Sequence, residues 1–247
     1  MVGFEPQSVK FEPMNPPAAV LLDVGGVFLL PSRDHIRAAL DQVGHRVDDD
    51  SAIDQAHYVA VRTFPMDLEG DEYMSPMWNE YLRAYAGFLG VAADTVPEAV
   101  EHLRNAYVTG WLWTHVIEES VAGLASLADT GVRLGVVSNA DGTIEQRLAD
   151  FEILQVGEGP GVDVEFVVDS GVVGVEKPDP RIFDFAIDLL DGQREDIWYV
   201  GDTPAFDVVG ARRAGLHPIL MDPFAVNGDY GVPCVTTLGE VASMVAN

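Results

Sequence analysis

Asp23 follows an apolar run, residues 18–22, and precedes Val24 and the glycines Gly25 and Gly26. The run predicts a buried strand that ends in a carboxylate. The two glycines let the backbone curve around an anion, and the strand holds the carboxylate in place. Two residues after Asp23, where an acid would share the strand face, the chain has Gly25. These residues suit a nucleophile that acts on a phosphate group.

Further segments place polar residues where strands end or helices begin. They are Ser138-Asn139, Lys177-Pro178, and Gly201-Asp202 with Asp207. Because the carboxyl ends of parallel strands open onto one crevice, we expect these side chains to meet Asp23 there. Carboxylates offer the hard oxygens that Mg²⁺ prefers, and cationic and hydrogen-bonding groups clamp a transferring phosphoryl group. A carboxylate can also be the nucleophile. The set therefore predicts Mg²⁺-assisted phosphoryl transfer.

The elements that position these residues alternate along the chain. Apolar runs predict strands at residues 20–23, 132–137, 165–168, 197–200 and 218–221. Helical patterns lie between them, and the last predicted helix spans residues 238–245. This alternation predicts an α/β fold, a Rossmann-like parallel sheet with helices on both faces.

The stretch between the first two strands is much longer than the dozen or so residues that a parallel crossover needs. Its apolar residues repeat at helical spacing, as at Ile36 and Leu40, and Ser75 with Pro76 predicts an N-cap and a first helical position. We therefore read residues 31–115 as an inserted α-helical cap domain, and residues 1–30 with 116–247 as the core domain.

Composition limits the class of protein. The chain has 247 residues, 48% of them hydrophobic, which indicates a globular protein with a sizeable core. The single cysteine, Cys234, excludes a disulfide framework and a cysteine-built metal site. The N-terminus lacks the pattern of a signal peptide, and no apolar stretch reaches the length of a membrane span, so we expect a cytoplasmic location.

The charge balance is strongly acidic, with 40 Asp and Glu against 14 Lys and Arg and a formal net charge of −26. Such a surface repels nucleic acid and anionic membranes, so we expect neither as a partner. Two origins of the acidity remain open. One is adaptation to high salt; the other is a GC-rich genome, which replaces lysine by arginine. The high apolar content favours the second. The oligomeric state stays open.

Four segments resemble, in order, the four motifs of the haloacid dehalogenase (HAD) superfamily of hydrolases, in the subclass with a helical cap after the first motif. They are Leu-Leu-Asp-Val-Gly-Gly-Val at residues 21–27, Val-Val-Ser-Asn at 136–139, Val-Glu-Lys-Pro-Asp-Pro-Arg-Ile-Phe at 175–183, and Val-Gly-Asp-Thr-Pro-Ala-Phe-Asp at 200–207. Each motif alone is a weak signal, whereas four in the right order are specific.

This resemblance implies roles for single residues. Asp23 attacks phosphorus and forms an aspartyl-phosphate, while Ser138 and Lys177 hold the phosphoryl oxygens. The implied ligands of Mg²⁺ are Asp23, Asp202 and the main-chain carbonyl of Gly25, with Asp207 supporting the metal directly or through water.

Substrate binding needs positive charge in a protein this acidic. We assign Asn139, Gly26 and Arg33 to it, with Lys177 as one cation and Arg62, Arg83 or Arg104 as further candidates. The substrate expected from the resemblance is a small phosphorylated metabolite. Four histidines match no metal spacing and are read as packing or surface residues; they are His57, His102, His115 and His217. Trp78, Trp111, Trp113 and Tyr85 are read as core of the cap, with the alternative that one of them lines the crevice.

Gly25 departs from the family pattern, in which a second Asp is the general acid and base. That group is typically worth about 10²–10⁴-fold in rate. Three interpretations remain open. In the first, the substrates have leaving groups that need no protonation, as in acyl or anomeric phosphates. In the second, another residue acts as the general acid and base, such as Asp34, His35 or a cap residue. In the third, the protein binds ligands without turning them over.

The leading hypothesis is thus a Mg²⁺-dependent phosphatase, and three rivals remain. A 2-haloacid dehalogenase resembles the chain in fold, but such enzymes typically carry Asp-x-Tyr-Gly-Thr at the first motif and lack the acid at residue 202. A phosphomutase depends on the acid at residue 25. A non-catalytic binding or regulatory protein on the same fold is the third, because fold alone does not set function.

Overall fold

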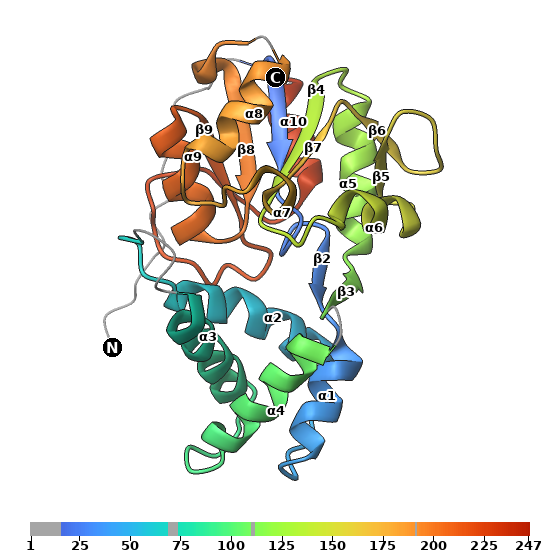
Figure 1. The fold of residues 1–247 in the computed structure, drawn as a ribbon. Helices are drawn as coiled ribbons and strands as arrows, with labels where there is room; N and C mark the ends of the chain where they lie inside the picture. Colours follow the sequence, from blue (N-terminus) through green and yellow to red (C-terminus); the bar gives the residue numbers. More distant parts are fainter. Residues whose placement is uncertain (1–15, 69–73, 110–111, 191) are drawn as a thin grey trace, which may run out of the picture.

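A six-stranded parallel sheet forms the centre of the larger part of the molecule (Figure 1). The computed structural model describes residues 16–68, 74–109, 112–190 and 192–247. The strand order is β10-β9-β8-β1-β4-β7, and every neighbouring pair is parallel. The strands are β1 (Ala19–Leu22), β4 (Arg133–Ser138), β7 (Val167–Asp169), β8 (Ile197–Gly201), β9 (His217–Met221) and β10 (Cys234–Val235).

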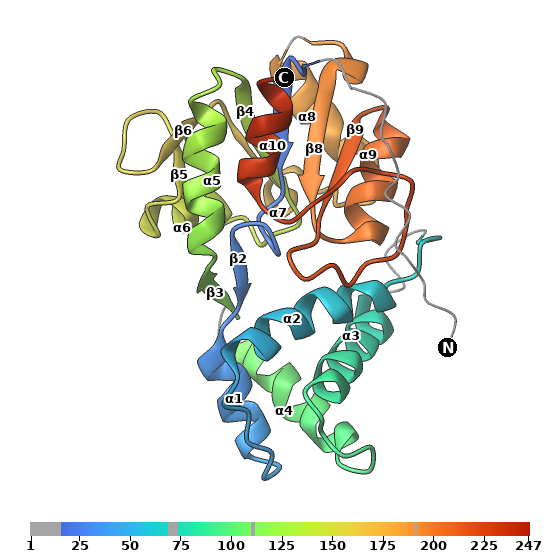
Figure 2. The ribbon, with the colours of Figure 1, turned by 180° about the vertical axis from the view of Figure 1, so that it is seen from behind.

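Helices cover both faces of this sheet, as the two opposite views show (Figures 1 and 2). Successive residues of a strand point to opposite faces. Val20 and Leu22 of β1 pack with one helix group, and Ala19 and Leu21 pack with the other. The first group contains α5 (Glu118–Ala128), α6 (Ile144–Asp150) and α10 (Leu238–Val245), and the second contains α8 (Arg181–Leu190) and α9 (Val209–Ala214). The central strands are therefore buried on both sides, which explains their continuous apolar runs.

A helical insertion, residues 33–109, lies at one end of the sheet and has a hydrophobic core of its own (Figure 1). Tyr85 is buried in that core, and its hydroxyl donates to the Ile53 carbonyl. Ala205 and Phe206, from the sheet part, also contact this core. The elements are α1 (Arg33–Asp41), α2 (Asp50–Ala60), the short 3₁₀ turn η1 (Val61–Thr63), α3 (Met74–Phe88) and α4 (Val96–Thr109).

Small elements that the sequence did not predict surround the end of the sheet. An antiparallel pair, β2 (Leu29–Pro31) and β3 (Trp113–Val116), connects the insertion to the sheet part. A parallel pair lies at the side, β5 (Leu154–Val156) with β6 (Val162–Val164). The short helix α7 (Ser170–Val173), the 3₁₀ turn η3 (Arg194–Asp196) and the π-helical turn η4 (Pro204–Val208) complete the chain.

The predicted α/β fold with a helical insertion is confirmed, and the last helix has the predicted bounds. Several predicted bounds were wrong by one or two residues, as at β1, which spans Ala19–Leu22 instead of 20–23. β7 begins at Val167 instead of residue 165, and α3 begins at Met74, one residue before the predicted N-cap Ser75. The division into domains at residues 31 and 116 stays an interpretation. Within the described ranges, no helix is both long and apolar enough to cross a membrane.

Candidate active site

The predicted site residues meet at the carboxyl ends of three adjacent strands. Asp23 directly follows β1, Ser138 ends β4, and Asp202 directly follows β8. The chain runs outward from β1 to β4 and β7 in one direction, and from β8 to β9 and β10 in the other. The site therefore lies where the strand order reverses, the usual place for a ligand in an open parallel sheet.

Lys177 forms the centre of a buried ionic cluster and is only 2% exposed. Its Nζ lies 2.8 Å from Oδ2 of Asp23 and 2.7 Å from Oδ1 of Asp207. It also donates to the Tyr199 hydroxyl at 2.8 Å, and that hydroxyl lies 3.0 Å from the Val137 carbonyl. One ammonium thus holds the candidate nucleophile and a second carboxylate in fixed positions.

Asn139 and Thr203 shape the loops around this cluster. The Asn139 amide accepts from the main-chain N–H of Lys177 at 2.7 Å and donates to its carbonyl at 3.0 Å. The main-chain N–H of Thr203 donates to Oδ2 of Asp207 at 2.8 Å. Asn139 was assigned to substrate binding; it lines the cavity, and its amide is bonded to the main chain of Lys177.

Burial shifts the pKa values of the ionisable groups in this cluster. Loss of water raises the pKa of Asp23, against the opposing attraction of Lys177. The same cause raises the pKa of Asp207 to about 7. Burial by itself would lower the pKa of Lys177, but the attraction of Asp207 and Asp23 outweighs it and raises that pKa. The site therefore has more buried negative charge than its one ammonium neutralises, and a further cation would stabilise it.

The three aspartates fit a hard divalent cation. Asp23, Asp202 and Asp207 each offer a carboxylate oxygen, and these oxygens lie within 4.8 Å of one another. Oδ1 of Asp23 is buried and has no hydrogen-bond partner within the described part of the chain. Such an orphaned oxygen is costly without a partner, and Mg²⁺ takes oxygen ligands of this kind. The residues present therefore match the Mg²⁺ that the sequence predicts.

Gly26 allows the Asp202 carboxylate to approach the loop after β1. Gly26 has a φ of +64°, and a Cβ on it would lie 2.2 Å from Cγ of Asp202. Only glycine leaves this space. Gly26 was assigned to substrate binding, yet its clearest structural role is this close packing against a candidate metal ligand.

We predict that Gly26→Ala weakens Mg²⁺ binding at least tenfold, because the new methyl group displaces the Asp202 carboxylate. Isothermal titration calorimetry with Mg²⁺ measures this loss. Gly44→Ala is the matched control, because Gly44 has a similar φ of +72° with nothing within 4 Å of the added carbon. In both variants, alanine at a positive φ costs about 1–3 kcal/mol of backbone strain. Equal Mg²⁺ affinities of the two variants would contradict the assignment of Asp202 to the metal.

His57 and Tyr58 of α2 bring the insertion into contact with this site. The His57 ring is 1% exposed; its Nε2 lies 2.8 Å from Oδ2 of Asp202, and its Nδ1 lies 2.9 Å from the Tyr81 hydroxyl. The Tyr58 hydroxyl donates to the Gly26 carbonyl at 2.8 Å. The sequence reading of His57 as a packing or surface residue missed this contact. No sequence spacing could reveal it, because His57 and Asp202 are 145 residues apart.

Trp113 of β3 occupies the space beside Gly25. A Cβ on Gly25 would lie 3.4 Å from Cζ3 of the Trp113 indole. The same indole lies against the His57 ring, with centroids 4.9 Å apart and the planes perpendicular. The position at which the family pattern has an acidic side chain is therefore covered by an apolar ring.

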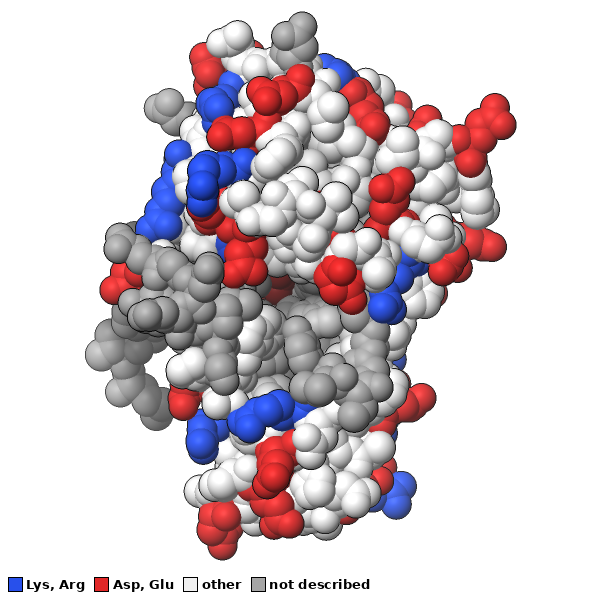
Figure 3. All heavy atoms as spheres, in the orientation of Figure 1, with Lys and Arg blue, Asp and Glu red and all other residues white. Residues whose placement is uncertain are grey.

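A cavity of about 400 Å³ opens between the sheet part and the insertion. Its polar end contains Asp23, Ser138, Lys177 and Asp202. Figure 3 shows the surface hollowed between the two parts. The volume is that of a small-ligand pocket.

Comparisons with known proteins agree with this geometry. The family model for haloacid dehalogenase-like hydrolases matches residues 17–215, which is most of the chain. The chain belongs to this family. The sequence resemblance is thereby confirmed.

The chain is similar in sequence to a curated phosphatase. It is 28% identical over 168 residues to a phosphoserine phosphatase of Thermus thermophilus, covering 62% of this chain and 65% of that protein. The chain spans between 48% and 65% of the length of the curated relatives it matches.

Solved structures support the fold. A HAD hydrolase of Bacillus subtilis, solved with bound magnesium, gives a TM-score of 0.57 at 18% identity, covering 96% of this chain and 100% of the other. The 2-haloacid dehalogenase of Pseudomonas syringae gives 0.51 at 18% identity, covering 94% and 98%.

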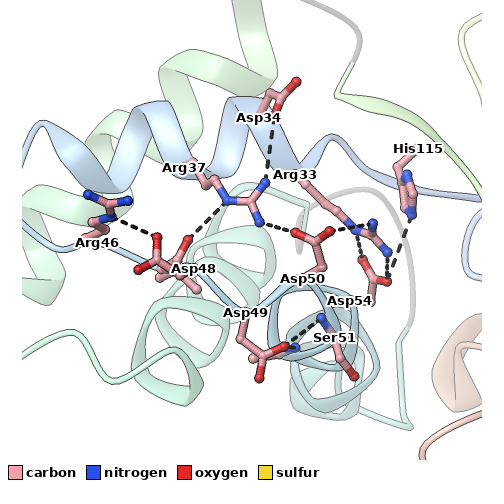
Figure 4. A network of polar contacts seen from close by, with 12 residues as sticks. Arg33, Asp34, Arg37, Arg46, Asp48, Asp49, Asp50, Ser51, Asp54 and His115 are labelled. Carbon is pink, nitrogen blue, oxygen red and sulfur yellow. Dashed lines mark hydrogen bonds and ion pairs between the residues drawn. The ribbon is translucent and has the colours of Figure 1, made fainter.

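Arg33 is not part of the cavity lining. It belongs to a network of ion pairs with Asp50 and Asp54 of α2 (Figure 4). Its Nε donates to Oδ1 of Asp54 at 2.9 Å, and its Nη1 lies 3.1 Å from Oδ2 of Asp50. Asp34, a candidate substitute acid, has a side chain 97% exposed and lies 3.8 Å from Arg37. His35 is also exposed and outside the cavity lining. Arg33 joins α1 to α2 through these ion pairs, and none of the three residues lines the cavity with Asp23.

The remaining candidate side chains are divided between the cavity and the exterior. Trp78, Trp113 and His57 line the cavity, whereas Tyr85 is interior to the insertion. Trp111 lies outside the described residues. Arg62, Arg83 and Arg104 do not line the cavity.

Proposed function

We propose that this protein is a Mg²⁺-dependent phosphatase of a small phosphorylated metabolite, with an aspartyl-phosphate intermediate on Asp23. The observation that carries the proposal is the position of the Asp23 carboxylate. It lies at the end of β1 beside the cavity, within 2.8 Å of Lys177 Nζ and grouped with the acidic Asp202 and Asp207. The similarity to a phosphoserine phosphatase supports phosphate esters as the substrate class.

The proposed first step breaks the bond between phosphorus and the leaving oxygen. A carboxylate oxygen of Asp23 attacks phosphorus, and the leaving oxygen departs with the bonding electrons. The Lys177 ammonium and the Ser138 hydroxyl hold the phosphoryl oxygens. Mg²⁺, bound by Asp23, Asp202 and the Gly25 carbonyl with support from Asp207, would supply positive charge to the phosphoryl group. Water then hydrolyses the aspartyl-phosphate and regenerates Asp23.

The position at which the family pattern has the general acid supplies no proton to the leaving oxygen, because residue 25 is glycine. Trp113 covers Gly25, and both ring nitrogens of His57 already have partners, Asp202 and the Tyr81 hydroxyl. Asp34 and His35 are outside the cavity lining. We therefore propose that the enzyme acts on esters whose leaving group departs without protonation.

We predict a steep dependence of turnover on the leaving group. Aryl phosphates, whose leaving groups have a pKa near 10 as in tyrosine, should react about 10²–10⁴-fold faster than alkyl phosphates, the factor that a general acid otherwise supplies. Steady-state phosphate release over a series of esters measures the slope. A flat series would instead indicate a substitute acid, with Glu176, Asp141 and His57 as the cavity-lining candidates.

Adding the missing acid is a second test of the same idea. Gly25→Asp alone should accelerate alkyl phosphates less than the double variant below, because the new side chain would lie in contact with the Trp113 ring, with its Cβ 3.4 Å from Cζ3. Gly25→Asp with Trp113→Ala should accelerate them about 10²-fold over Trp113→Ala alone. No difference between these two variants would contradict the proposal.

Phosphate release from a metabolite panel, with and without Mg²⁺, tests the function as a whole. Two rivals give different results. Chloride release from 2-chloropropionate would indicate a dehalogenase, which the buried Asp202 next to Asp23 disfavours. Ligand binding without turnover of any activated ester would indicate a binding or regulatory protein. A phosphomutase is disfavoured by Gly25.

A further inference from the structure

Part of the cavity lining is aromatic and apolar, with residues from the insertion, from β3 and from η4. Phe64 lies 5.3 Å from Trp78 and 5.1 Å from Phe206, measured between ring centroids. Trp78, Trp113 and Phe206 are only partly buried, and all three line the cavity. Val61 and Leu112 complete this wall. Contact with a flat apolar group is the most favourable interaction that such a surface can make.

The same cavity offers no spare cation. Of the 14 Lys and Arg residues, only Lys10 lies outside the described ranges, and among the others only Lys177 lines the cavity. Lys177 is already bonded to Asp23 and Asp207. Basic side chains appear on the surface of the insertion beside the hollow in Figure 3, but they are not part of its lining.

Two arginines of the insertion, Arg33 and Arg104, are bonded to partners outside the cavity lining. Arg33 pairs with Asp50 and Asp54, and Arg104 donates to the Asn79 side chain. The guanidinium of Arg33 would have to leave two carboxylates in order to bind a substrate. It is therefore not a ready partner for an anionic group.

Two carboxylates beyond the catalytic cluster also line the cavity, those of Asp141 and Glu176. They would repel a second phosphate or a carboxylate on the substrate. Asp141 already accepts from Thr143 and lies 3.8 Å from Arg147, so its charge is partly compensated and does not call for a cationic ligand.

We infer that the organic part of the substrate is an uncharged aromatic ring. The protein is then a phosphatase of aryl phosphates whose only charged group is the phosphate. This inference rests on the proposed function. Two independent features agree on it. The apolar wall favours an aryl group by contact, and the covered Gly25 favours an aryl leaving oxygen because it departs without protonation. The second anionic group of a doubly charged ester would find no Lys or Arg partner except Lys177 among the described residues that line this cavity.

A pair of nearly isosteric probes isolates the effect of charge. They are 4-carbamoylphenyl phosphate, which is neutral on the ring, and 4-carboxyphenyl phosphate, which carries a carboxylate. We expect kcat/KM of the wild-type protein with Mg²⁺ to be at least tenfold higher for the amide. Equal values, or a preference for the carboxylate, would overturn the inference, as would a preference for the cationic 4-(trimethylammonio)phenyl phosphate.

Binding of the corresponding phosphonates separates this inference from the phosphatase function. Phosphonates cannot be hydrolysed, so calorimetry reports recognition alone. We expect the carbamoylphenyl phosphonate to bind at least tenfold more tightly than the carboxyphenyl one. If no phosphate ester is turned over but this preference holds, the phosphatase function fails and the inferred ligand class stands. If esters are turned over without the preference, the ligand class fails.

Trp78→Ala tests the aromatic wall directly. We expect it to raise KM for 4-carbamoylphenyl phosphate about tenfold, and to change KM for acetyl phosphate, which has no ring, much less. Phe88→Ala is the matched control, because Phe88 lies on the same helix, is 40% exposed and is not part of the cavity lining. Equal KM changes for the two substrates in Trp78→Ala would contradict contact between this wall and the ring. The wild-type probe comparison decides the inference even if Trp78→Ala does not fold.

Discussion

Asp23→Asn should abolish phosphate release, with a fall in turnover of about 10⁴-fold or more, the range found when a catalytic nucleophile is removed. An amide does not attack phosphorus, so no aspartyl-phosphate forms. Asn has the size of Asp, and Lys177 keeps its contact with Asp207 in the variant. The fold should therefore survive. Phosphate release with Mg²⁺ and acid trapping of the phosphoenzyme measure the effect.

Asp34→Asn is the control for this prediction. Asp34 is also an aspartate, but it lies in α1 of the insertion, its side chain is 97% exposed, and it does not line the cavity. We expect full activity in this variant. Retained activity in Asp23→Asn would exclude Asp23 as the nucleophile, and loss of activity in Asp34→Asn would revive Asp34 as a substitute acid.

Lys177→Met should be the most destabilising substitution in the site. It leaves Asp23 and Asp207 buried without their shared cation. Breaking a buried pair on one side costs about 3–5 kcal/mol of the free energy of unfolding, because the remaining charge stays uncompensated. Urea denaturation without Mg²⁺ measures this loss. Phosphate release should also be lost, because the phosphoryl group loses its ammonium partner.

A double variant separates charge imbalance from lost packing. Asp207→Asn added to Lys177→Met removes one of the two uncompensated carboxylates, so we expect it to restore part of the stability. The two sites are in contact, so their effects should not add. Strictly additive losses would show that the buried charges do not govern the stability of this cluster.

The requirement for a bound cation follows from the same arrangement. Three buried carboxylates meet one ammonium, and the phosphate group of a substrate would add further negative charge. The acidity of the chain as a whole, with a net charge of −26, provides no compensation at long range. In the proposed function, Mg²⁺ supplies this compensation locally.

Much of the fold follows from local patterns along the chain. The apolar runs before Asp23, Ser138 and Asp202 predicted the central strands, because strands covered on both faces are continuously apolar. The order of the polar segments predicted that they meet at one edge of the sheet. Small pairs such as β2 with β3 escaped prediction, because three or four residues show too little periodicity.

The sequence by itself predicted the residues of the candidate site, namely Asp23, Ser138, Lys177, Asp202 and Asp207, and the absence of an acid at Gly25. Asp23, Ser138 and Asp202 end or directly follow strands, and parallel strands bring their carboxyl ends together at one edge of the sheet. Only the tertiary structure decided what faces that edge. It placed Trp113 over Gly25, His57 on Asp202 and Arg33 away from the cavity. Contacts between the insertion and the sheet join residues far apart in the chain, and their side-chain packing leaves no periodic signal in the sequence.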